Sequence, residues 1–489
     1  MPPEDPISNY PGQSSISYSM YSEGSSYRKK YNNGLVGDYG TGFVIGDLIG
    51  VAFDATNGTL EFFRNGISEG VAFTGIPSRT YLPAVADGTS GGGATLVVNF
   101  GQKPFKFPPP AGFQPLTLAN LPRPTIVRPD QYVGIVTYSG NSSSNASGTT
   151  QSLTGLNFNG IPDLVWIKNR NVTGSHAVFD SVRGATNWLA TNNTNQESSN
   201  ANYLKSFNYN GFTLGSDNLV NGDASNSGGP YVAWCWKAGG NSNTYNIDGV
   251  GYATTTAAGL TSGNITGASV NTKSGFSIIK LTTSASSGTY TVSHGLGKSP
   301  AFFITKRLNG TSQWWTYHTS VGYTGYLNLC TTAGAATDYS WGAAPTSTTI
   351  TYTNDFLVGS SDYIIYSWAE IPGFSKFGSY TGNNSADGPV IITGFRPKII
   401  IFKRSDSSSQ ADWRIMDSTR SPYNVADKQL FANLSSEELS SSNYYCDFLS
   451  NGFKIRNNWD GTNGTSTIIY ACFAETPSFN LYGGQANAR

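Results

Sequence analysis

The stretch that decides the fold is PDLVWIK at residues 162–168, because the same pattern occurs three times in the chain. Its counterparts are PAFFITK at 300–306 and PKIIIFK at 397–403. Each copy is a short, mostly apolar run that starts with proline and ends with lysine, which is typical of a buried β-strand. A pattern that returns in this way indicates that one structural unit has been copied along the chain.

Three more segments recur in the same order after each copy. The next strand reads AVFDSVR at 177–183 and RIMDSTR at 414–420, whereas the middle copy departs from it with WTYH at 315–318. An Asn-Gly-Phe or Asn-Asp-Phe turn follows in every copy, and this turn chemistry suits a tight hairpin. The copies close on aromatic strands at residues 231–236, 363–368 and 468–473. Blocks of about 100 residues with this order of short strands predict β-sandwiches.

The predicted fold class is therefore all-β, with tandem β-sandwich domains. Residues 115–131 are rich in proline, which fixes φ and cannot donate to a sheet, so they are expected to form an extended linker. A stretch rich in Gly, Thr, Ser and Asn at 241–274 is predicted to be a second linker. The predicted domains are an N-terminal sandwich at 1–114 and three repeated sandwiches at 132–240, 275–375 and 376–489.

The charge balance argues against a nucleic-acid partner. Lys plus Arg and Asp plus Glu number 30 each, whereas a nucleic-acid binder needs a basic excess to neutralise phosphates. No run approaches the ~20 apolar residues that cross a bilayer, so no membrane insertion is expected. The N-terminus has neither the basic start nor the apolar run of a signal peptide. Four distant cysteines are expected to be small buried side chains rather than metal ligands: Cys235, Cys330, Cys446 and Cys472.

Residues 46–102 carry the most legible motifs of the chain. Gly46-Asp47 opens a predicted strand that ends at Asp54, and a second strand returns to the turn Arg64-Asn65-Gly66. Further strands are predicted for YLPAV at 81–85 and VVNFGQ at 97–102. This order closely resembles a SPRY domain, a concanavalin-like antiparallel β-sandwich. Members of that family usually have several more strands before this point, so the resemblance implies that the sandwich is N-terminally short or is completed by a neighbouring segment or subunit.

The repeated part, roughly residues 130–480, resembles the tandem β-domains of tail-fibre and virion-surface proteins of marine bacteriophages. The segments that carry this resemblance are YVAWCWKAGG at 231–240, HGLGKSP at 294–300 and FGSYTGN at 377–383. The resemblance implies a structural protein on the surface of an extracellular phage particle.

The residues that could carry catalysis form no recognisable motif. His176, His294 and His318 are isolated from one another, so no metal site and no cofactor is expected. No GxSxG motif is present and Cys330 has no evident histidine partner, so hydrolase triads have no support.

Paired acids are the remaining route to an enzyme, because glycoside hydrolysis needs two carboxylates in one groove. Asp180 and Asp417 hold equivalent positions in two copies, where the middle copy has His318. Such matching positions are expected to cap turns rather than to converge on one site. Glu437-Glu438 lies in a Ser-rich stretch and is predicted to be a solvated loop.

Aromatic residues could provide platforms for sugars, but most of them fall within predicted strands. We therefore expect Trp234, Trp236, Trp314-Trp315 and Trp413 to pack in the core. Tyrosines predicted to lie in exposed loops are Tyr10, Tyr21, Tyr27 and Tyr31. The Gly-rich stretch Ser90–Gly93 is not followed by Lys-Ser or Lys-Thr, and it is predicted to be a loop rather than a phosphate cradle.

These observations predict a non-enzymatic bacteriophage virion structural protein, either a tail fibre or a capsid-attached fibre, that contacts the host surface through loops. The expected partners are other virion proteins, further copies of the chain with a trimer favoured, and a host surface glycan. No individual ligand-binding residue is assigned. Two alternatives stay open: an architectural decoration or connector protein without a host ligand, and a polysaccharide depolymerase.

Overall fold

The computed structural model describes residues 11–23, 27–78, 81–86, 95–117, 120, 124–143, 148–226, 228–241, 243–284, 288–339 and 341–477. The chain divides into two compact units, Met1–Pro122 and Arg123–Arg489, which we call the N-terminal unit and the C-terminal unit. The boundary falls inside the predicted linker at 115–131. Each unit is described by itself.

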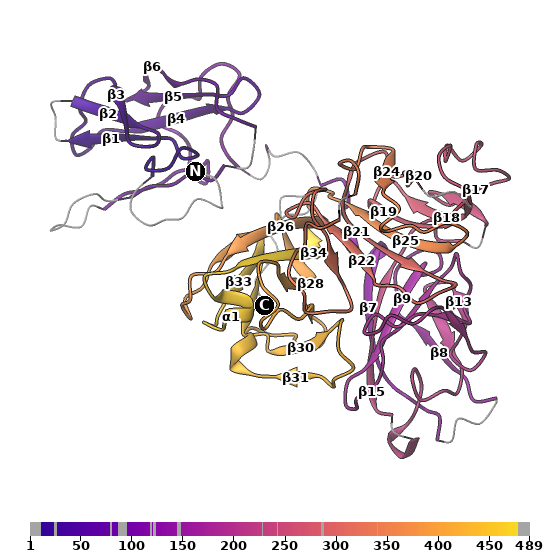
Figure 1. Cartoon of the computed structure of the whole chain (residues 1–489). Helices are drawn as coiled ribbons and strands as arrows, with labels where there is room; N and C mark the ends of the chain where they lie inside the picture. Colours follow the sequence, from indigo (N-terminus) through magenta and orange to yellow (C-terminus); the bar gives the residue numbers. More distant parts are fainter. Residues whose placement is uncertain are drawn as a thin grey trace. The chain divides into compact units, whose positions relative to one another are not determined.

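The N-terminal unit contains two three-stranded antiparallel sheets (Figure 1). The first comprises β1 (Ser19–Glu23), β2 (Tyr27–Tyr31) and β3 (Leu35–Asp38), and the second comprises β4 (Ile49–Asp54), β5 (Thr59–Arg64) and β6 (Ile67–Phe73). The ammonium of Lys30 in β2 donates to the carbonyl of Ala72 in β6 at 2.7 Å and so ties the two sheets together. Tyr18 packs edge-on against Phe73 in the small core of this unit.

The predicted Asn-Gly turn forms, and the Gly-Asp motif holds it in place. Asn65 and Gly66 have φ values of 49° and 83°, the left-handed pair that a two-residue hairpin requires. The carboxylate of Asp47 accepts hydrogen bonds from Arg64 Nε at 2.9 Å and from Asn65 Nδ2 at 2.7 Å. These contacts join the entry of β4 to the end of β5, which explains why the two motifs occur together.

Two predicted strands of this unit do not form. Residues 81–86 and 95–102 are described and contain no strand, although their sequences are rich in β-forming residues. Val97 is 87% exposed. A β-forming sequence becomes a strand only where a partner backbone and a packing face are available. Because neither sheet pairs with these segments, the strand predictions at 81–85 and 97–102 are wrong.

The C-terminal unit contains three β-sandwiches, each with a large and a small sheet, as the repeats predict. Sandwich 1 packs the sheet β10-β9-β15-β7 on β13-β14-β8. Its strands are β7 (Val133–Ser139), β8 (Gln151–Thr154), β9 (Leu164–Asn169), β10 (Ala177–Asp180), β13 (Leu204–Asn208), β14 (Gly211–Leu214) and β15 (Pro230–Trp236). A short hairpin of β11 (Asn187–Trp188) and β12 (Ser198–Ser199) follows β10.

Sandwich 2 packs the sheet β17-β16-β18-β19-β25-β21-β22-β23 on β20-β24. Its strands are β16 (Tyr245–Ile247), β17 (Val250–Tyr252), β18 (Ile265–Asn271), β19 (Phe276–Thr282), β20 (Tyr290–Ser293), β21 (Pro300–Arg307), β22 (Trp315–His318), β23 (Leu327–Asn328), β24 (Thr349–Tyr352) and β25 (Asp362–Ala369).

Sandwich 3 contains the sheet β26-β34-β28-β29-β30-β31 and the sheet β27-β33-β32. Its strands are β26 (Ser375–Thr381), β27 (Val390–Ile392), β28 (Phe395–Arg404), β29 (Arg414–Asp417), β30 (Lys428–Phe431), β31 (Leu439–Ser440), β32 (Cys446–Leu449), β33 (Gly452–Ile455) and β34 (Thr467–Pro477). The described helices of the unit are short: η2 (Pro129–Gln131), η3 (Ala224–Asn226), η4 (Ser442–Tyr444) and α1 (Asp460–Asn463).

Residues 241–274, predicted to be a linker, instead extend the large sheet of sandwich 2. β16 pairs with β17 in antiparallel and with β18 in parallel orientation, and β18 pairs with β19. The composition of this stretch concealed the strands, because backbone pairing needs no large apolar side chain. Small residues such as Ala268 and Ser269 in β18 are fully or almost fully buried.

The closing strands β15, β25 and β34 are buried on both faces. Successive side chains of a strand point to opposite faces, and in β15 these faces belong to different cores. Tyr231, Ala233 and Cys235 pack inside sandwich 1, whereas Val232, Trp234 and Trp236 pack in a larger core with residues of all three sandwiches. We call this larger cluster the central core. The sandwiches therefore share one core and are not the separate domains that the sequence predicts.

Three aromatic side chains at equivalent positions of the closing strands meet in the central core. The ring centroids of Trp236 and Trp368 are 6.1 Å apart, those of Trp236 and Phe473 are 5.5 Å apart, and those of Trp368 and Phe473 are 6.3 Å apart. Each ring thus contacts the other two, which is the pattern expected around a threefold axis. We call this set the aromatic triangle.

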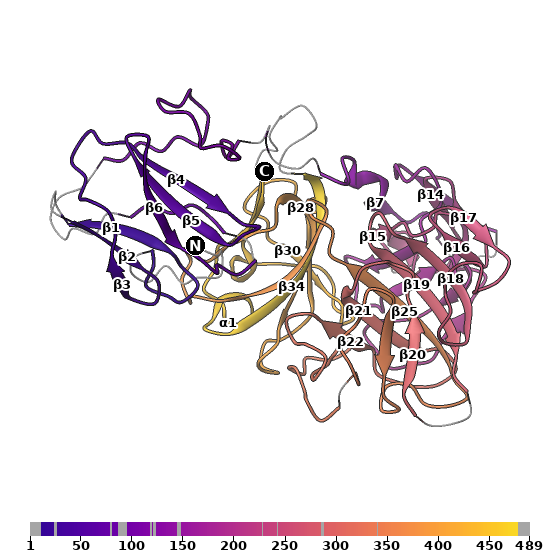
Figure 2. The ribbon, with the colours of Figure 1, turned by 90° about the horizontal axis from the view of Figure 1, so that it is seen from above.

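Equivalent backbone hydrogen bonds join the sandwiches in one rotational sense. In every copy, the carbonyl two residues after the repeated lysine accepts a bond from a neighbouring sandwich. The bonds are Glu197 N to Leu308 O at 2.9 Å, Ala335 N to Ser405 O at 2.7 Å and Glu438 N to Arg170 O at 2.8 Å. Sandwich 1 therefore binds sandwich 2, sandwich 2 binds sandwich 3, and sandwich 3 binds sandwich 1. Figures 1 and 2 show the strands of the three sandwiches side by side.

Candidate functional site

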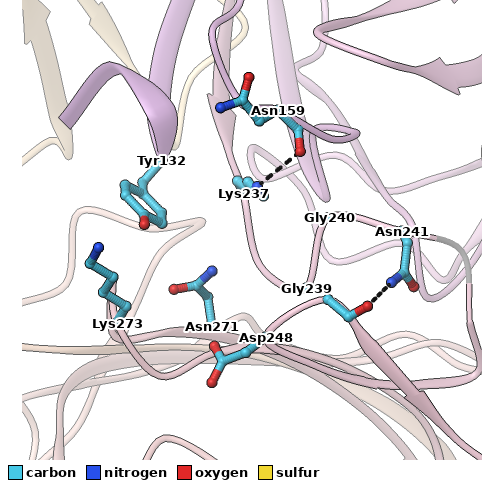
Figure 3. A pocket seen from close by; sticks show the side chains of 10 residues that line it. Tyr132, Asn159, Lys237, Gly239, Gly240, Asn241, Asp248, Asn271 and Lys273 are labelled. Atoms are coloured by element: carbon cyan, nitrogen blue, oxygen red, sulfur yellow. Dashed lines mark hydrogen bonds between the residues drawn. The ribbon is translucent and has the colours of Figure 1, made fainter. Parts of the chain in front are cut away.

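A polar pocket of about 570 Å³ lies where sandwich 1 meets strands β16–β18, which extend the large sheet of sandwich 2 (Figure 3). The side chains that line it include Tyr132, Asn159, Lys237, Asp248, Asn271 and Lys273, and backbone from Gly239, Gly240 and Gly249 completes the wall. All of these residues lie in turns or at strand ends. Loops placed on a packed scaffold are a common location for binding sites.

The tight turn between β16 and β17 forms one side of the pocket. Asp248 and Gly249 have φ values of 54° and 89°, as a two-residue hairpin loop requires. The Asp248 carboxylate accepts hydrogen bonds from the backbone N–H of Thr272 at 2.8 Å and from its hydroxyl at 2.6 Å. These bonds attach the hairpin to the end of β18 and give this acid a structural role in shaping the pocket.

The side-chain amide of Asn271 also has a structural role at the pocket. Its Nδ2 donates to the carbonyl of Ala238 at 3.1 Å, and its Oδ1 accepts from the N–H of Ser274 at 2.8 Å. Asn271 is buried, so these two bonds satisfy its polar atoms and connect the end of β18 to the segment after β15.

Two lysines supply positive charge to the pocket. Lys237 Nζ donates to the carbonyls of Phe158 and Asn159, and burial lowers the pKa of Lys237 below its ordinary value. Lys273 is exposed, and its ammonium has no hydrogen-bond or ion-pair partner among the described residues. Lys273 is therefore available to an incoming ligand.

The carboxylate of Asp163 is buried next to the backbone of residues 238–240, which contributes to the pocket wall. Asp163 is fully buried and accepts four hydrogen bonds: from Ser181 Oγ at 2.6 Å, Ser269 Oγ at 2.7 Å, and the N–H groups of Ala238 and Gly240, both at 2.8 Å. Burial raises the pKa of Asp163 to about 6. The carboxylate ties the pocket wall to β18. Sequence reasoning missed this role, although the first repeat alone has an acid at this position.

The predicted turn-capping role of Asp180 and Asp417 is confirmed, and each acid also contacts another sandwich. Asp180 accepts from the N–H of Val182 at 3.1 Å, and Asp417 accepts from the N–H of Thr419, also at 3.1 Å. Asp180 further accepts from the hydroxyl of Tyr366 in sandwich 2 at 2.7 Å. Asp417 accepts from Trp234 Nε1 of sandwich 1 at 3.0 Å.

The same two acids are buried against arginines. Asp180 pairs with Arg183 at 2.5 Å and Asp417 with Arg420 at 2.5 Å, and all four side chains are inaccessible to solvent. The structure does not bring the two acids together as a catalytic pair; each belongs to its own turn.

In sandwich 2, His318 occupies the position of the two acids. Toward the neighbouring sandwich it donates a hydrogen bond, whereas the acids accept one. Its Nδ1 accepts from the N–H of Ser320 at 3.1 Å, which reproduces the turn cap of the acids. Its Nε2 donates to the carbonyl of Tyr470 at 3.0 Å. Sandwich 3 has Ala471 where the other closing strands have Trp234 and Tyr366, so no side-chain donor is available there. A histidine that donates to a backbone carbonyl takes the place of an acid that accepts.

All three histidines make the same pair of hydrogen bonds. In each, Nδ1 accepts from a neighbouring N–H group and Nε2 donates to a carbonyl: Phe431 O for His176, Thr346 O for His294 and Tyr470 O for His318. Burial lowers their pKa values to about 3, 4 and 4, respectively. No group of three or more His, Cys, Asp or Glu that could hold a metal ion occurs in the described part of the chain.

The prediction of a solvated loop at Glu437-Glu438 is wrong for Glu438. Its side chain is 12% exposed and accepts from Arg170 and from Arg420. These contacts lower the pKa of Glu438 even though burial acts in the opposite direction. Because Arg170 belongs to sandwich 1, the carboxylate connects sandwich 3 to sandwich 1. A partner 268 residues away leaves no local signal in the sequence.

Most tryptophans and cysteines occupy the predicted places. Trp234, Trp236, Trp314 and Trp413 are buried, and Trp315 is partly buried against the core of sandwich 2. Cys235, Cys446 and Cys472 are buried thiols, whereas Cys330 is partly exposed.

Of the tyrosines expected in exposed loops, Tyr21 is exposed as predicted, but Tyr21, Tyr27 and Tyr31 lie in strands. Tyr21 is 40% exposed, but it lies in β1, and Tyr31 lies in β2 and is partly buried. Tyr10, the side chain of Tyr27 and the stretch Ser90–Gly93 lie outside what the structure describes. Within the described ranges no helix is long and apolar enough to cross a membrane.

Curated relatives match the N-terminal part of the chain. An E3 ubiquitin-protein ligase, RKP, of Arabidopsis thaliana is 44% identical over 82 residues, which is 16% of this chain and 6% of that protein. The Ran-binding proteins 9/10 homolog of Drosophila melanogaster is 34% identical over 101 residues, 21% of this chain and 10% of that protein. The ATP-dependent RNA helicase DDX1 of Xenopus laevis is 38% identical over 91 residues, 19% and 12% of the two chains. The chain thus spans a small part of these relatives.

Two family matches cover most of the chain. The SPRY domain family matches residues 6–103, which confirms the resemblance found in the N-terminal motifs. No solved structure matches the chain. The second match covers residues 128–477, the three sandwiches with their shared core. The chain therefore carries an N-terminal SPRY domain and belongs to the family described as domain of unknown function DUF7483.

Proposed function

We propose that this chain is a structural protein on the surface of a bacteriophage particle, a tail fibre or capsid-attached fibre that contacts host-surface glycans. The polar pocket is the observation that carries the proposal, because it is assembled from turns that a shared, fully packed core holds in place. The low charge content and the resemblance of the repeated part to virion-surface β-domains support the extracellular location.

The proposed function includes no catalytic step. Asp180 and Asp417 are each buried against an arginine, and the one acid among the residues that line the pocket is Asp248. Glycoside hydrolysis needs two carboxyl groups on either side of the bond. This pocket therefore offers no second carboxylate for that reaction, and under the proposal incubation with host polysaccharide leaves its chain length unchanged.

We propose the SPRY domain as a second binding module. The relatives that share this segment are named for three different activities: ubiquitin ligation, Ran binding and RNA unwinding. A segment common to proteins with such different names is more consistent with recognition than with any one reaction.

The proposed partners are other virion proteins and further copies of the chain, with a trimer as the expected assembly. Nucleic acid and membrane insertion have no part in the proposal. Light scattering of the purified chain tests the trimer. A mass near three times 52.1 kDa supports it, and the mass of a single chain contradicts it.

Electron microscopy of the parent phage with a gold-labelled antibody against this chain tests the function. The expected result is label on the tail or capsid surface, and label nowhere on the particle contradicts the proposal. Binding of the purified chain to host cells then separates a host-contacting fibre from a decoration or connector protein, which would not bind them.

A further inference from the structure

In the pocket between sandwich 1 and strands β16–β18 of sandwich 2, the side chains of Asp248 and Asn271 are already engaged, whereas a charged donor is free. Both oxygens of Asp248 accept from Thr272, and the amide of Asn271 bonds to Ala238 and Ser274. The ammonium of Lys273 has no partner among the described residues. A ligand that fits this pattern is rich in hydrogen-bond acceptors.

The charge of the pocket is positive. The lining includes two lysines, Lys237 and Lys273, and one acid, Asp248, whose carboxylate is already held by two hydrogen bonds. Figure 3 shows the Lys273 side chain extending toward Tyr132 along one side of the pocket, with Asn271 and Asp248 beside it. A ligand carboxylate can form charge-assisted hydrogen bonds with these ammonium groups, and such bonds are stronger than neutral ones.

Tyr132 adds an aromatic surface next to the free lysine. It is partly buried, and its ring packs edge-on against Phe374 with centroids 5.9 Å apart, which fixes the ring. An aromatic side chain that presents an apolar ring and a polar hydroxyl suits a ligand with both kinds of surface. A sugar ring has such surfaces, with C–H groups on its faces and hydroxyls at its edges.

Two glycines contribute only backbone to another part of the wall. A side chain at Gly240 would meet the aliphatic part of Lys237 at 2.5 Å, and a side chain at Gly239 would meet Asn246 at 2.2 Å. Neither position has room for a side chain, so this part of the wall is backbone. The volume of about 570 Å³ falls within the range of small-ligand sites.

We infer that this pocket binds a carboxylate-bearing sugar residue of a host surface polysaccharide, with Lys273 and Lys237 facing the carboxylate and Tyr132 facing the sugar ring. The inference rests on the proposed function and names the class of glycan that this site takes.

The test is a titration of the full chain with methyl glucuronide and with methyl glucoside, followed by saturation-transfer NMR. These probes differ only in the carboxylate. The expected result is binding of the glucuronide with a dissociation constant of about 1 mM, weakened by added salt, and at least tenfold weaker binding of the glucoside. Equal binding of the two, or no binding of the glucuronide, overturns the inference.

Two lysine variants test whether the glucuronide binds in this pocket. Lys273→Gln is expected to weaken glucuronide binding about tenfold, the effect of losing one charge-assisted hydrogen bond. Lys298→Gln is the matched control, because Lys298 is also exposed and lies outside the pocket. Both positions are at the surface, so both variants are expected to fold. Unchanged binding in Lys273→Gln, or an equal loss in the two variants, overturns the inference. Tighter binding of glucose 6-phosphate than of the glucuronide also overturns it, because the site then prefers a phosphate.

Host-cell binding by the same proteins separates this inference from the proposed function. If the chain labels the particle and binds host cells, but ignores the glucuronide, the function stands and this inference falls. If the chain labels no part of the particle, the proposed function falls, whatever the sugar titration gives.

Discussion

Trp236 and Trp368 occupy the same position in two closing strands, and their rings meet edge-on with centroids 6.1 Å apart. Phe473 from the third closing strand contacts both rings. Three repeats of one chain therefore meet in the way that three subunits of a closed trimer meet. The packing of each sandwich depends on the other two, and the following predictions test that dependence.

Removal of one ring of the aromatic triangle should destabilise the whole C-terminal unit. Trp368→Ala leaves a cavity among tightly packed rings, and such a change costs about 3–5 kcal/mol of unfolding free energy. Urea unfolding followed by circular dichroism measures it. Tyr423→Ala is the control, because that ring is 79% exposed, and its expected change is within about 0.5 kcal/mol. Similar losses in the two variants would contradict the shared core.

Neutralising Asp417 should be more harmful than neutralising an exposed acid in the same sandwich. Asp417→Asn removes the carboxylate that pairs with Arg420 Nε, leaves the buried guanidinium with Glu438 as its remaining acid, and weakens the bond from Trp234. Breaking a buried ion pair in this way costs about 3–5 kcal/mol. Asp387→Asn is the matched control, since the Asp387 side chain is 86% exposed. The same urea titration compares them, and equal stabilities would show that the contact between sandwiches contributes nothing.

The histidine of the middle repeat should not tolerate the acid that its counterparts use. His318→Asp places a carboxylate against the carbonyl of Tyr470, so that two acceptors face each other without a proton. An unsatisfied buried polar group costs about 1–3 kcal/mol, and more when it is charged. Thermal unfolding at pH 7 should show the loss, and acidification toward pH 5 should reduce the gap to the wild type as the carboxyl gains a proton. A variant as stable as the wild type at pH 7 contradicts the exchange of hydrogen-bonding roles described for this position.

Because the three repeated lysines are buried, we expect the free energy of unfolding to rise with pH. Burial lowers the pKa values of Lys168, Lys306 and Lys403 to about 8, 8 and 7 from an ordinary value of 10.5. Above pH 7 the unfolded chain therefore holds more protons at these positions than the folded chain does. The stabilising contribution is complete above pH 10.5 and is lost as pH falls through the folded values.

Thermal unfolding of the wild type and of Lys403→Met between pH 7 and pH 9 measures this effect. Each lysine contributes up to about 1.4 kcal/mol per pH unit while the two states differ by a full proton. The variant should show a smaller increase of unfolding temperature across the interval. Parallel curves for the two proteins would show that Lys403 titrates normally in the folded chain.

Much of the fold could be predicted from the sequence, because recognisable residues mark the ends of the repeated strands. Residues 162–168 and their two counterparts mark equivalent central strands, and the Asn-Gly sequence at 65–66 predicts the hairpin turn before β6. The shared core was not predicted. The closing strand at 231–236 is apolar at every position, which indicates burial on both faces, but a strand cannot specify what covers its second face.

The pocket was not predicted, because it depends on contacts between segments that are distant in sequence. The composition of residues 241–274 is that of a linker, and the β16–β17 hairpin acquires its role only when Asp248 attaches it to Thr272 at the end of β18. Asn271 in turn connects this strand end to Ala238 after β15. Asp163 shows the same limitation. Its position in the first repeat is visible in the sequence, whereas its bond to Ser269 is not.

Hydrogen exchange of the full chain, followed by mass spectrometry of peptides from β15, β25 and β34, tests the shared core most directly. If the three sandwiches form one cooperative body, the slowest amides of all three strands should open with the same free energy, and Trp368→Ala should lower all three values equally. Different opening free energies for the three strands, or a change confined to β25, would contradict the account.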